Sequence, residues 1–303
     1  MEDSMSAPVV VAYDQTPHSK SAVAEAVREA VSRGTGLRIV HAYTTVERIP
    51  MGPFSTVLPA GNVEPTNRHD AEEILAELAA AIRADQPALA VETSAVPGEA
   101  AAAIVAQARD ACLLVLGSRG RGGFTGLLLG STSQRVLADA VCPVIVVHDT
   151  PSEPKGEILV GLDIDGPCDD LLEFAFDTAA RLGTGLVAAT VWTEPWAMAY
   201  AARLGDEDGL AYEQARADRL KELLDPWRGK HPDVGVVARL YAAVRSGTAG
   251  TCLVEASTNA DLLIVGARSE AGHRHANRLG PVAHAALHHA HCPVAVVPSS
   301  DDR

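Results

Sequence analysis

Short, uninterrupted runs of apolar and β-branched residues alternate along the chain with longer Ala- and Leu-rich stretches of helical period. This alternation is typical of βαβ units, in which helices connect the strands of a parallel sheet. In the first half of the chain, strands are predicted at 8–13, 37–43, 89–96, 112–117 and 143–148, with helices at 17–33, 67–84, 98–109 and 132–140. The strands are apolar throughout, as expected where helices cover both faces. The pattern predicts a doubly wound sheet, which binds ligands at the carboxyl ends of its strands.

The same pattern occurs twice. VVVAYD at 9–14 matches ILVGLD at 158–163, and LLVLGSR at 113–119 matches LLIVGAR at 262–268, both at an offset of 149. VCPVIVV at 141–147 matches HCPVAVV at 291–297 at an offset of 150, so the second copy has gained one residue before its last strand. A repeat of this length indicates a duplicated domain and not a solenoid. The predicted domains are 1–148 and 157–303, joined by a polar, Pro-rich linker at 149–156.

Composition narrows the class of protein. With 303 residues, 47% of them hydrophobic, the chain can bury two cores of ordinary domain size. The net charge of −14 opposes binding to nucleic acid or to an anionic membrane surface. The sequence contains no apolar run of roughly 20 residues and no signal-peptide pattern at its start, so a cytoplasmic protein is expected. The five cysteines are widely spaced and lack a CxxC pair, and we interpret them as small buried hydrophobic residues.

Candidate chemistry follows the fourth predicted strand. The motif G-x-x-G-x9-G-S is formed by Gly117, Gly120, Gly130 and Ser131. Because Gly117 and Gly120 have no Cβ, the backbone there can adopt a positive φ and bring its N–H groups close to an anion. Gly130 and Ser131 are expected to begin a helix whose amino terminus favours phosphate, with Arg119 and Arg121 as counter-charges. The motif is neither a Walker P-loop nor a dinucleotide fingerprint.

With these motifs the chain resembles the universal stress protein family, specifically its tandem, ATP-binding members of the actinobacterial type. The first copy matches the family signature G-2x-G-9x-G-[ST] throughout, and the resemblance extends from Val9 to Val297. It implies an α/β fold of two tandem Rossmann-like domains of the adenine nucleotide alpha hydrolase type, each a five-stranded parallel sheet with helices on both faces. It also implies bound ATP, with or without Mg²⁺, and a regulatory role in stress response and growth control through an unknown protein partner. The two repeats are expected to pair through their last strands as an internal pseudo-dimer, and two chains to associate as a homodimer.

The resemblance also implies roles for individual residues. Asp14 and the backbone of Ala12 are expected to contact adenosine, and Ala42 to contact adenine through its main chain. The residues expected at the phosphates are Gly117, Arg119, Gly120, Arg121, Gly130, Ser131, Thr132 and Ser133. Asp14 has a second interpretation that is compatible with the first, because Asp-Gln-Thr-Pro at 14–17 is also a turn that starts a helix.

The second copy departs from the signature. Ser269 replaces the second glycine, the spacer before Gly280 is ten residues long, and Pro281 replaces the hydroxyl residue. Proline removes one N–H and one hydroxyl from the phosphate site, and we expect the extra residue to displace the helix end relative to the strand. A weaker second site is therefore predicted, formed by Asp163, Val191, Gly266 and Gly280.

The second copy is also rich in histidine. His284 and His288 have the i, i+4 spacing that can chelate a transition metal. Without a nearby carboxylate or spaced cysteine pair, a solvated helix face is the better interpretation, and no metal site is predicted.

A slow ATP hydrolase or an adenylyl-transferring enzyme of related fold is the alternative function. The sequence offers no evident nucleophile or paired carboxylates over the loop, so no catalytic residue is assigned. His18 is the nearest candidate for a base, but we expect it to be a solvent-facing helix residue.

Overall fold

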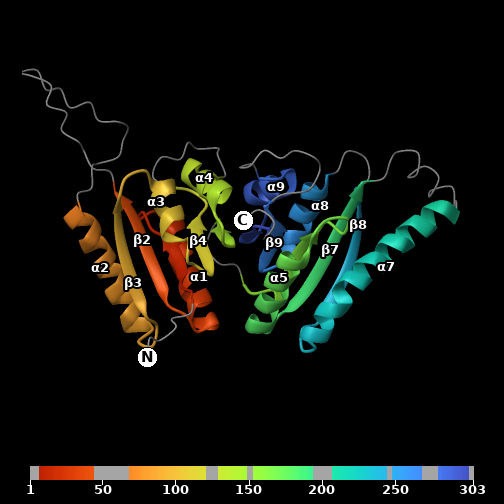
Figure 1. Ribbon diagram of the computed structural model, residues 1–303, viewed down its shortest axis with the longest axis horizontal. Coiled ribbons are helices and arrows are strands. Elements are labelled where there is room, and N and C mark those ends of the chain that lie inside the picture. The colour runs from red at the N-terminus through yellow and green to blue at the C-terminus, as the bar shows by residue number, and fades with distance from the viewer. Residues whose placement is uncertain are drawn as a thin grey trace, which may run out of the picture. The chain divides into compact units, whose positions relative to one another are not determined.

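The computed structural model describes residues 7–43, 68–120, 129–148, 153–193, 207–243, 248–267 and 279–299. The chain divides into two compact units, Met1–Thr150 and Pro151–Arg303, which repeat the same order of strands and helices (Figure 1). Arg121 in the first unit and Ser269 in the second lie outside the described residues.

The first unit is a parallel sheet with the strand order β3-β2-β1-β4-β5. Its elements are β1 (Val9–Ala12), α1 (Pro17–Arg33), β2 (Leu37–Tyr43), α2 (Arg68–Asp85), β3 (Val91–Pro97), α3 (Ala100–Gln107), β4 (Leu113–Gly117), α4 (Ser131–Asp139) and β5 (Val144–Val147). The doubly wound sheet predicted from the hydrophobic pattern is confirmed.

The strand order places a switch point between β1 and β4. The chain builds outward from β1 through β2 to β3, then returns to the other side of β1 to add β4 and β5. With right-handed crossovers, this reversal places α1 and α2 on one face and α3 and α4 on the other. The contacts agree, since α1 packs on β1 and β4 whereas α3 packs against α4. The carboxyl ends of β1 and β4 therefore lie side by side at the position where such sheets bind ligands.

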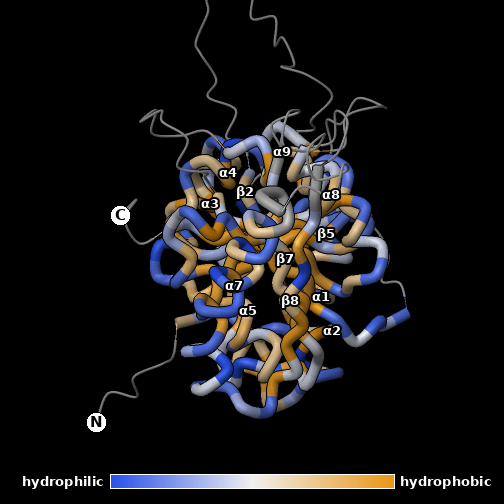
Figure 2. The backbone as a smooth tube through the Cα atoms, turned by 90° about the vertical axis from the view of Figure 1, so that its right-hand side faces the viewer, coloured by the Kyte–Doolittle hydropathy of each residue, from blue (hydrophilic) through white to orange (hydrophobic). Residues whose placement is uncertain are grey.

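Helix α1 shows how local sequence sets an element's bounds. Thr16 caps its start by accepting a hydrogen bond from the Ser19 backbone N–H, and Pro17 is its first residue. Gly34 ends the helix in the left-handed conformation, with a φ of 62°. Beneath it Val9, Val10 and Val11 of β1 are fully buried, and Figure 2 shows the most apolar colouring concentrated on the strands.

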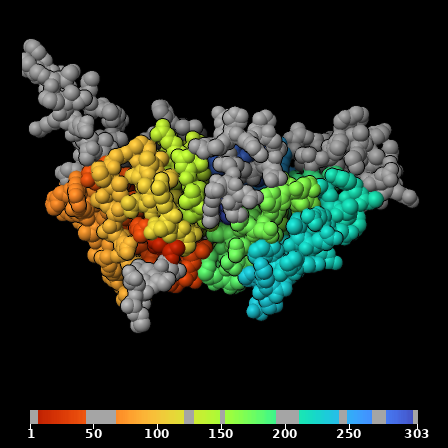
Figure 3. All heavy atoms as spheres, viewed as in Figure 1, coloured from red at the N-terminus to blue at the C-terminus, as the bar shows by residue number. Residues whose placement is uncertain are grey.

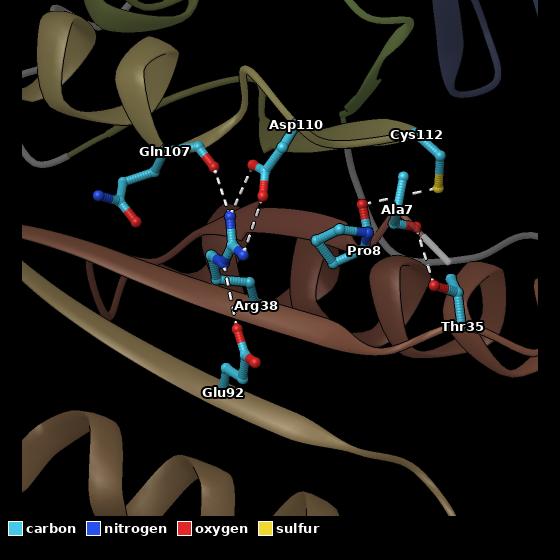
Figure 4. A network of polar contacts seen from close by, with 8 residues as sticks. All are labelled: Ala7, Pro8, Thr35, Arg38, Glu92, Gln107, Asp110 and Cys112. Carbon is cyan, nitrogen blue, oxygen red and sulfur yellow. Dashed lines mark hydrogen bonds and ion pairs between the residues drawn. The ribbon is translucent and has the colours of Figure 1, made fainter. Parts of the chain in front are cut away.

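A polar network lies at the end of the first sheet where its strands begin (Figure 4). Arg38 on β2 donates to Asp110 at 2.8 Å, to Glu92 on β3 at 3.3 Å and to the Gln107 carbonyl at 3.0 Å. The hydrogen bond from Arg38 holds the pKa of Asp110 below its ordinary value. The network ties β2 and β3 to the end of α3, far along the strands from the switch point.

The second unit repeats this architecture with the strand order β8-β7-β6-β9-β10, again all parallel. Its elements are β6 (Glu157–Leu162), α5 (Asp169–Leu182), β7 (Gly185–Thr193), α7 (Glu207–Lys230), β8 (Val236–Ala243), α8 (Ala249–Ala256), the 3-10 turn η1 (Ser257–Asn259), β9 (Leu262–Gly266), α9 (Pro281–His289) and β10 (Val294–Val297). Helices α2 and α7 each present an outer face to solvent (Figure 3). Across the described part of the chain, no helix is long and apolar enough to cross a membrane.

Candidate functional site

The turn between β1 and α1 holds Asp14 in place. Its Oδ1 accepts hydrogen bonds from the Thr16 backbone N–H at 3.1 Å and from the Thr16 hydroxyl at 2.6 Å. Between them Gln15 has a φ of 68°, the one positive φ at a non-glycine residue among the described residues. Thr16, not Asp14, caps the helix. The turn thus uses one carboxylate oxygen for its own structure, at a backbone conformation of the strained kind that clusters at functional sites.

The other carboxylate oxygen of Asp14 faces the glycine loop that follows β4. A Cβ built on Gly120 would lie 2.9 Å from Asp14 Oδ2, which is closer than real Cβ contacts allow. The structure therefore brings together two residues that are more than 100 positions apart, and a side chain at position 120 would require the Asp14 carboxylate to shift. This meeting occurs at the switch point between β1 and β4.

The two ends of the glycine loop are tied to each other and to the sheet. The Gly130 N–H donates to the Ser118 carbonyl at 2.7 Å, and the Ser118 N–H donates to Val147 on β5 at 2.8 Å. The buried Ser133 hydroxyl donates to the Gly117 carbonyl at 2.9 Å, so this side chain supports the loop from below. The predicted position of Ser133 close to the phosphates stays a prediction, and its hydroxyl is engaged with the backbone of the loop.

Helix α4 begins at the exposed residue Ser131, and no side chain caps its amino terminus. The first N–H groups of a helix have no partner within the helix, and the positive end of its dipole points outward with them. Thr132 in the same turn is half-buried. Among the described residues, Arg119 Nε is buried without a hydrogen-bond partner. An anion with several acceptor oxygens would satisfy both groups.

None of the motif glycines has a positive φ, and only Gly117 is required by close packing against backbone. Among the described residues, the glycines with positive φ are Gly34, Gly98, Gly156 and Gly183. Gly117 and Gly120 therefore do not use the positive φ that glycine allows. A Cβ on Gly117 would lie 2.8 Å from the backbone C and O atoms of His18, because the end of β4 passes directly against the start of α1. A Cβ on Gly130 would meet only ordinary contacts, from 3.5 Å outward.

His18 is not the solvent-facing residue that the sequence suggested. It is half-buried, and its Nδ1 lies 2.7 Å from the carbonyl oxygen of His148, just after β5. The carbonyl can only accept, so Nδ1 carries the proton and the ring orientation is fixed.

Ala12 and Ala42 lie near the carboxyl ends of β1 and β2. Both are half-buried, and they pair in the sheet with Val40 and Val96 respectively. Beside them the buried His41 ring places its Nδ1 2.7 Å from the Tyr13 carbonyl and so fixes the chain after β1. Sequence reasoning missed this contact, and a buried histidine inside an apolar strand was the available signal.

The second unit keeps the frame of the loop despite its extra residue. The Gly280 N–H donates to the Ala267 carbonyl at 2.8 Å, and the Ala267 N–H donates to Val297 at 2.9 Å, which repeats the bonds of Ser118. Helix α9 begins at Pro281 after the N-cap Gly280, as α4 begins after Gly130. The prediction that the extra residue displaces the helix was wrong, because Gly280 makes the same hydrogen bond as Gly130 does at the equivalent position. Pro281 as first helical residue is confirmed.

The turn after β6 differs strongly in charge from the turn after β1. The stretch 163–170 contains Asp163, Asp165, Asp169 and Asp170, whereas the matching stretch 14–21 contains Asp14 and Lys20. Asp163 is exposed and accepts from the Asp165 N–H at 3.3 Å, and Asp165 pairs with Arg216 of α7 at 3.0 Å. Two of the carboxylates occupy the first turn of α5, where they already complement the helix dipole.

The remaining predicted residues of the second unit lie at strand ends. Val191 is half-buried near the end of β7, and Gly266 is the last residue of β9. The Cys168 thiol beside the turn donates to the Asp163 carbonyl at 3.0 Å, and burial raises its pKa to about 11, so it stays protonated. The rings of His284 and His288 lie 4.4 Å apart. No group of three or more metal-ligating side chains is found within the described residues.

Comparison with known proteins fits this arrangement. The universal stress protein family profile matches residues 5–148 and again 156–298. The chain belongs to the universal stress protein family. A universal stress protein of Mycobacterium tuberculosis is 39% identical over 297 residues, covering 96% of this chain and 97% of the relative.

A solved structure of matching extent shows the same fold. A universal stress protein from Archaeoglobus fulgidus superposes with a TM-score of 0.67 at 21% identity, covering 99% of this chain and 98% of its own. A second structure from that organism, in complex with dAMP, is 25% identical, covers 47% of this chain and 98% of its own, and has a TM-score of 0.33.

Proposed function

We propose that this universal stress protein is an ATP-binding regulatory protein in stress response and growth control, and that its first unit holds the nucleotide. The observation that carries the proposal is the meeting of Asp14 and Gly120 at the switch point between β1 and β4. A carboxylate there can accept from ribose hydroxyls, while the adjacent loop offers backbone N–H groups to phosphate.

The residues fit ATP in two parts. Asp14 and the backbone at Ala12 and Ala42 would hold adenosine at the ends of β1 and β2. The loop and the start of α4 would hold the phosphates through these residues: Gly117, Arg119, Gly120, Arg121, Gly130, Ser131 and Thr132. The buried, unpartnered Nε of Arg119 supports this placement, because a phosphate oxygen would supply its missing acceptor.

The second unit would bind ATP weakly or not at all. Pro281 removes a backbone donor and a hydroxyl at the helix start, and four aspartates lie between the end of β6 and the first turn of α5. Each lost charge-assisted hydrogen bond to phosphate costs about 1.5–3 kcal/mol, so two losses weaken binding roughly a hundredfold or more.

Chromatography of the nucleotide released when purified protein is denatured tests the proposal directly. ATP is expected, and titration calorimetry should give about one tight site per chain. The matched variants are Gly130→Ala and Gly280→Ala, which add the same methyl group at equivalent positions of the two units. Gly130→Ala should retain the fold, because its Cβ meets only contacts of 3.5 Å or more, and should lose the tight site. Wild-type protein that neither carries nor binds ATP would overturn the proposal. Tight binding retained in Gly130→Ala would show that the ATP site does not include the start of α4.

A turnover assay separates regulation from catalysis. The proposed regulator should release ADP far more slowly than the typical enzyme turnover of about 10 per second. Multiple turnovers per minute would favour the ATP hydrolase instead. Pairing of the two repeats through their last strands stays a prediction, which small-angle scattering of the full chain can test.

A further inference from the structure

Two side chains of the first unit form hydrogen bonds with the carbonyl oxygen of His148. This residue follows β5, at the position where the chain leaves the unit. Its carbonyl oxygen accepts from His18 Nδ1 at 2.7 Å and lies 3.4 Å from the Ser118 hydroxyl, which donates to it more weakly. His18 belongs to the first turn of α1, and Ser118 is the first residue after β4. The exit of the chain is therefore held by two side chains from two other elements.

The same two residues also border the glycine loop. The backbone of His18 lies against Gly117, so closely that no Cβ fits between them. Ser118 accepts the hydrogen bond that closes the loop at Gly130, and its own N–H is bonded to Val147. A displacement of the loop therefore acts on groups that hold the exit, through direct contacts and without intervening residues.

The second unit lacks every side chain of this arrangement. Position by position, Pro167 replaces His18, Ala267 replaces Ser118 and Pro298 replaces His148. Neither proline nor alanine has a side-chain donor. The backbone bonds of the loop persist in the second unit, so the loop frame itself does not require the histidine. The side-chain clamp is present in the first unit, whose exit leads to the second unit.

We propose that His18 is a coupling residue, which transmits occupation of the glycine loop by ATP to the point where the chain leaves the first unit. The inference rests on the proposed ATP site of that unit. ATP orders the loop from Gly117 to Gly120, and the ordered loop holds Ser118 and His18 against the His148 carbonyl. The exit is then held more tightly with ATP than without it. By linkage, a held exit strengthens ATP binding by the same factor.

Hydrogen exchange of the full-length chain, with and without ATP and Mg²⁺, measures the coupling. The reporter is the peptide that spans 144–155. In wild type, ATP should slow its exchange by about fivefold or more, the lower range of allosteric couplings. In His18→Ala, ATP should slow the exchange of this peptide by less than about twofold. The Kd for ATP should rise by the same factor by which the slowing of exchange is reduced. The variant removes the imidazole and leaves the backbone contact with Gly117 in place.

Two further variants make the test specific. His18→Asn should restore the effect, because its amide nitrogen can donate from nearly the position of Nδ1. Lys20→Ala, an exposed change two residues along α1, should behave as wild type. Tight ATP binding without any change at 144–155 would overturn the coupling and leave the proposed function standing. An unaltered ATP effect in His18→Ala would overturn the role of His18, and absence of ATP binding in wild type would overturn both proposals.

Discussion

The two units carry the same backbone frame at the switch point but surround it with different side chains. In both, the glycine before the fourth helix donates to the residue that follows the fourth strand, at 2.7 Å from Gly130 and 2.8 Å from Gly280. The stretch from the end of the first strand into the first helix carries one aspartate and one lysine in the first unit, and four aspartates in the second. A duplicated fold thus retained its hydrogen-bonded frame while the chemistry of its edge diverged, because frame and site depend on different atoms.

The start of the first helix shows the same divergence at shorter range. In the first unit the Thr16 side chain caps α1 by accepting from the Ser19 backbone N–H, and the helix begins at Pro17. In the second unit Cys168 makes no side-chain cap bond, and α5 begins at Asp169. The turn before α5 is longer than the turn before α1, and it carries Asp165 beside Asp163, the residue that corresponds to Asp14. The comparison predicts two unequal sites, and substitutions that exchange features between the units test it.

The largest effect is expected from Ser131→Pro, which copies Pro281 into the first unit. Proline is favoured at the first position of a helix, and Gly130 already has the extended backbone, φ −74° and ψ 153°, that precedes proline comfortably. The fold should therefore persist. Loss of the N–H and hydroxyl should weaken ATP binding roughly a hundredfold or more by titration calorimetry.

The reciprocal variant, Pro281→Ser, completes the exchange. It should strengthen nucleotide binding by the second unit without making the units equal, because the aspartates after β6 remain. An unchanged Kd in Ser131→Pro would mean that the start of α4 does not contact phosphate.

A smaller but distinct effect is expected from Gly117→Ala, on stability. The added Cβ would collide with the His18 backbone at 2.8 Å, and a clash with backbone is relieved only by shifting α1 or β4. Overpacking of this kind costs about 1–3 kcal/mol, which urea unfolding can measure. Gly130→Ala is the control and should unfold within about 0.5 kcal/mol of wild type. Equal stability of the two variants would show that α1 yields easily at this contact.

Gly117 and Gly120 illustrate what the sequence could and could not predict. The alternation of apolar runs and helical periods gave the strands and helices of both units, since burial on a sheet imposes that pattern locally. The close approach of Gly117 to His18, and of Gly120 to Asp14, joins residues about 100 positions apart and follows only from the folded chain. Glycine spacing therefore located the loop, but the positive φ that glycine allows is not used there, and Gly117 is required instead by close packing.

In the second unit, the sequence misled about the helix position and showed the charge of the turn without its context. Counting residues predicted a displaced helix, but insertion of one residue into a loop changes neither end when both ends are fixed by hydrogen bonds. The charge of the turn after β6 was readable in the sequence, yet its relevance required knowing that Asp165 and Arg216 lie together at the same edge.

The aspartates supply the third test. In a Ser131→Pro background, where the second site dominates, Asp165→Asn with Asp169→Asn should raise ATP affinity about three- to tenfold at low salt. Removal of two like charges near a phosphate lowers the repulsion, and salt screening should shrink the gain. Asp233→Asn, an exposed change before β8, is the matched control. A gain that is independent of salt, or equal in the control, would contradict an electrostatic cause.

The smallest difference concerns how each unit caps its third helix. Glu99 caps α3 by accepting at 2.9 Å from the Ala102 N–H, and the equivalent residue Thr248 caps α8. The backbone hydrogen bond from Ala102 holds the pKa of Glu99 below its ordinary value of 4.5. A depressed carboxyl pKa contributes stability above the ordinary pKa and loses it as the pH falls through the folded value. Threonine does not titrate, so only the cap of the first unit weakens in acid.

Glu99→Thr copies the second unit's cap into the first and should remove this pH dependence. At pH 7 the variant should unfold in urea within about 0.5 kcal/mol of wild type, because either side chain accepts the N–H bond. As the pH falls below 4.5, the variant should become the more stable of the two. Other carboxyls, such as Asp110 beside Arg38, titrate in both proteins and cancel from the difference. Thr248→Ala should lose the same stability at both pH values, and a Glu99→Thr difference that stays constant with pH would show that the cap contributes through packing and not through charge.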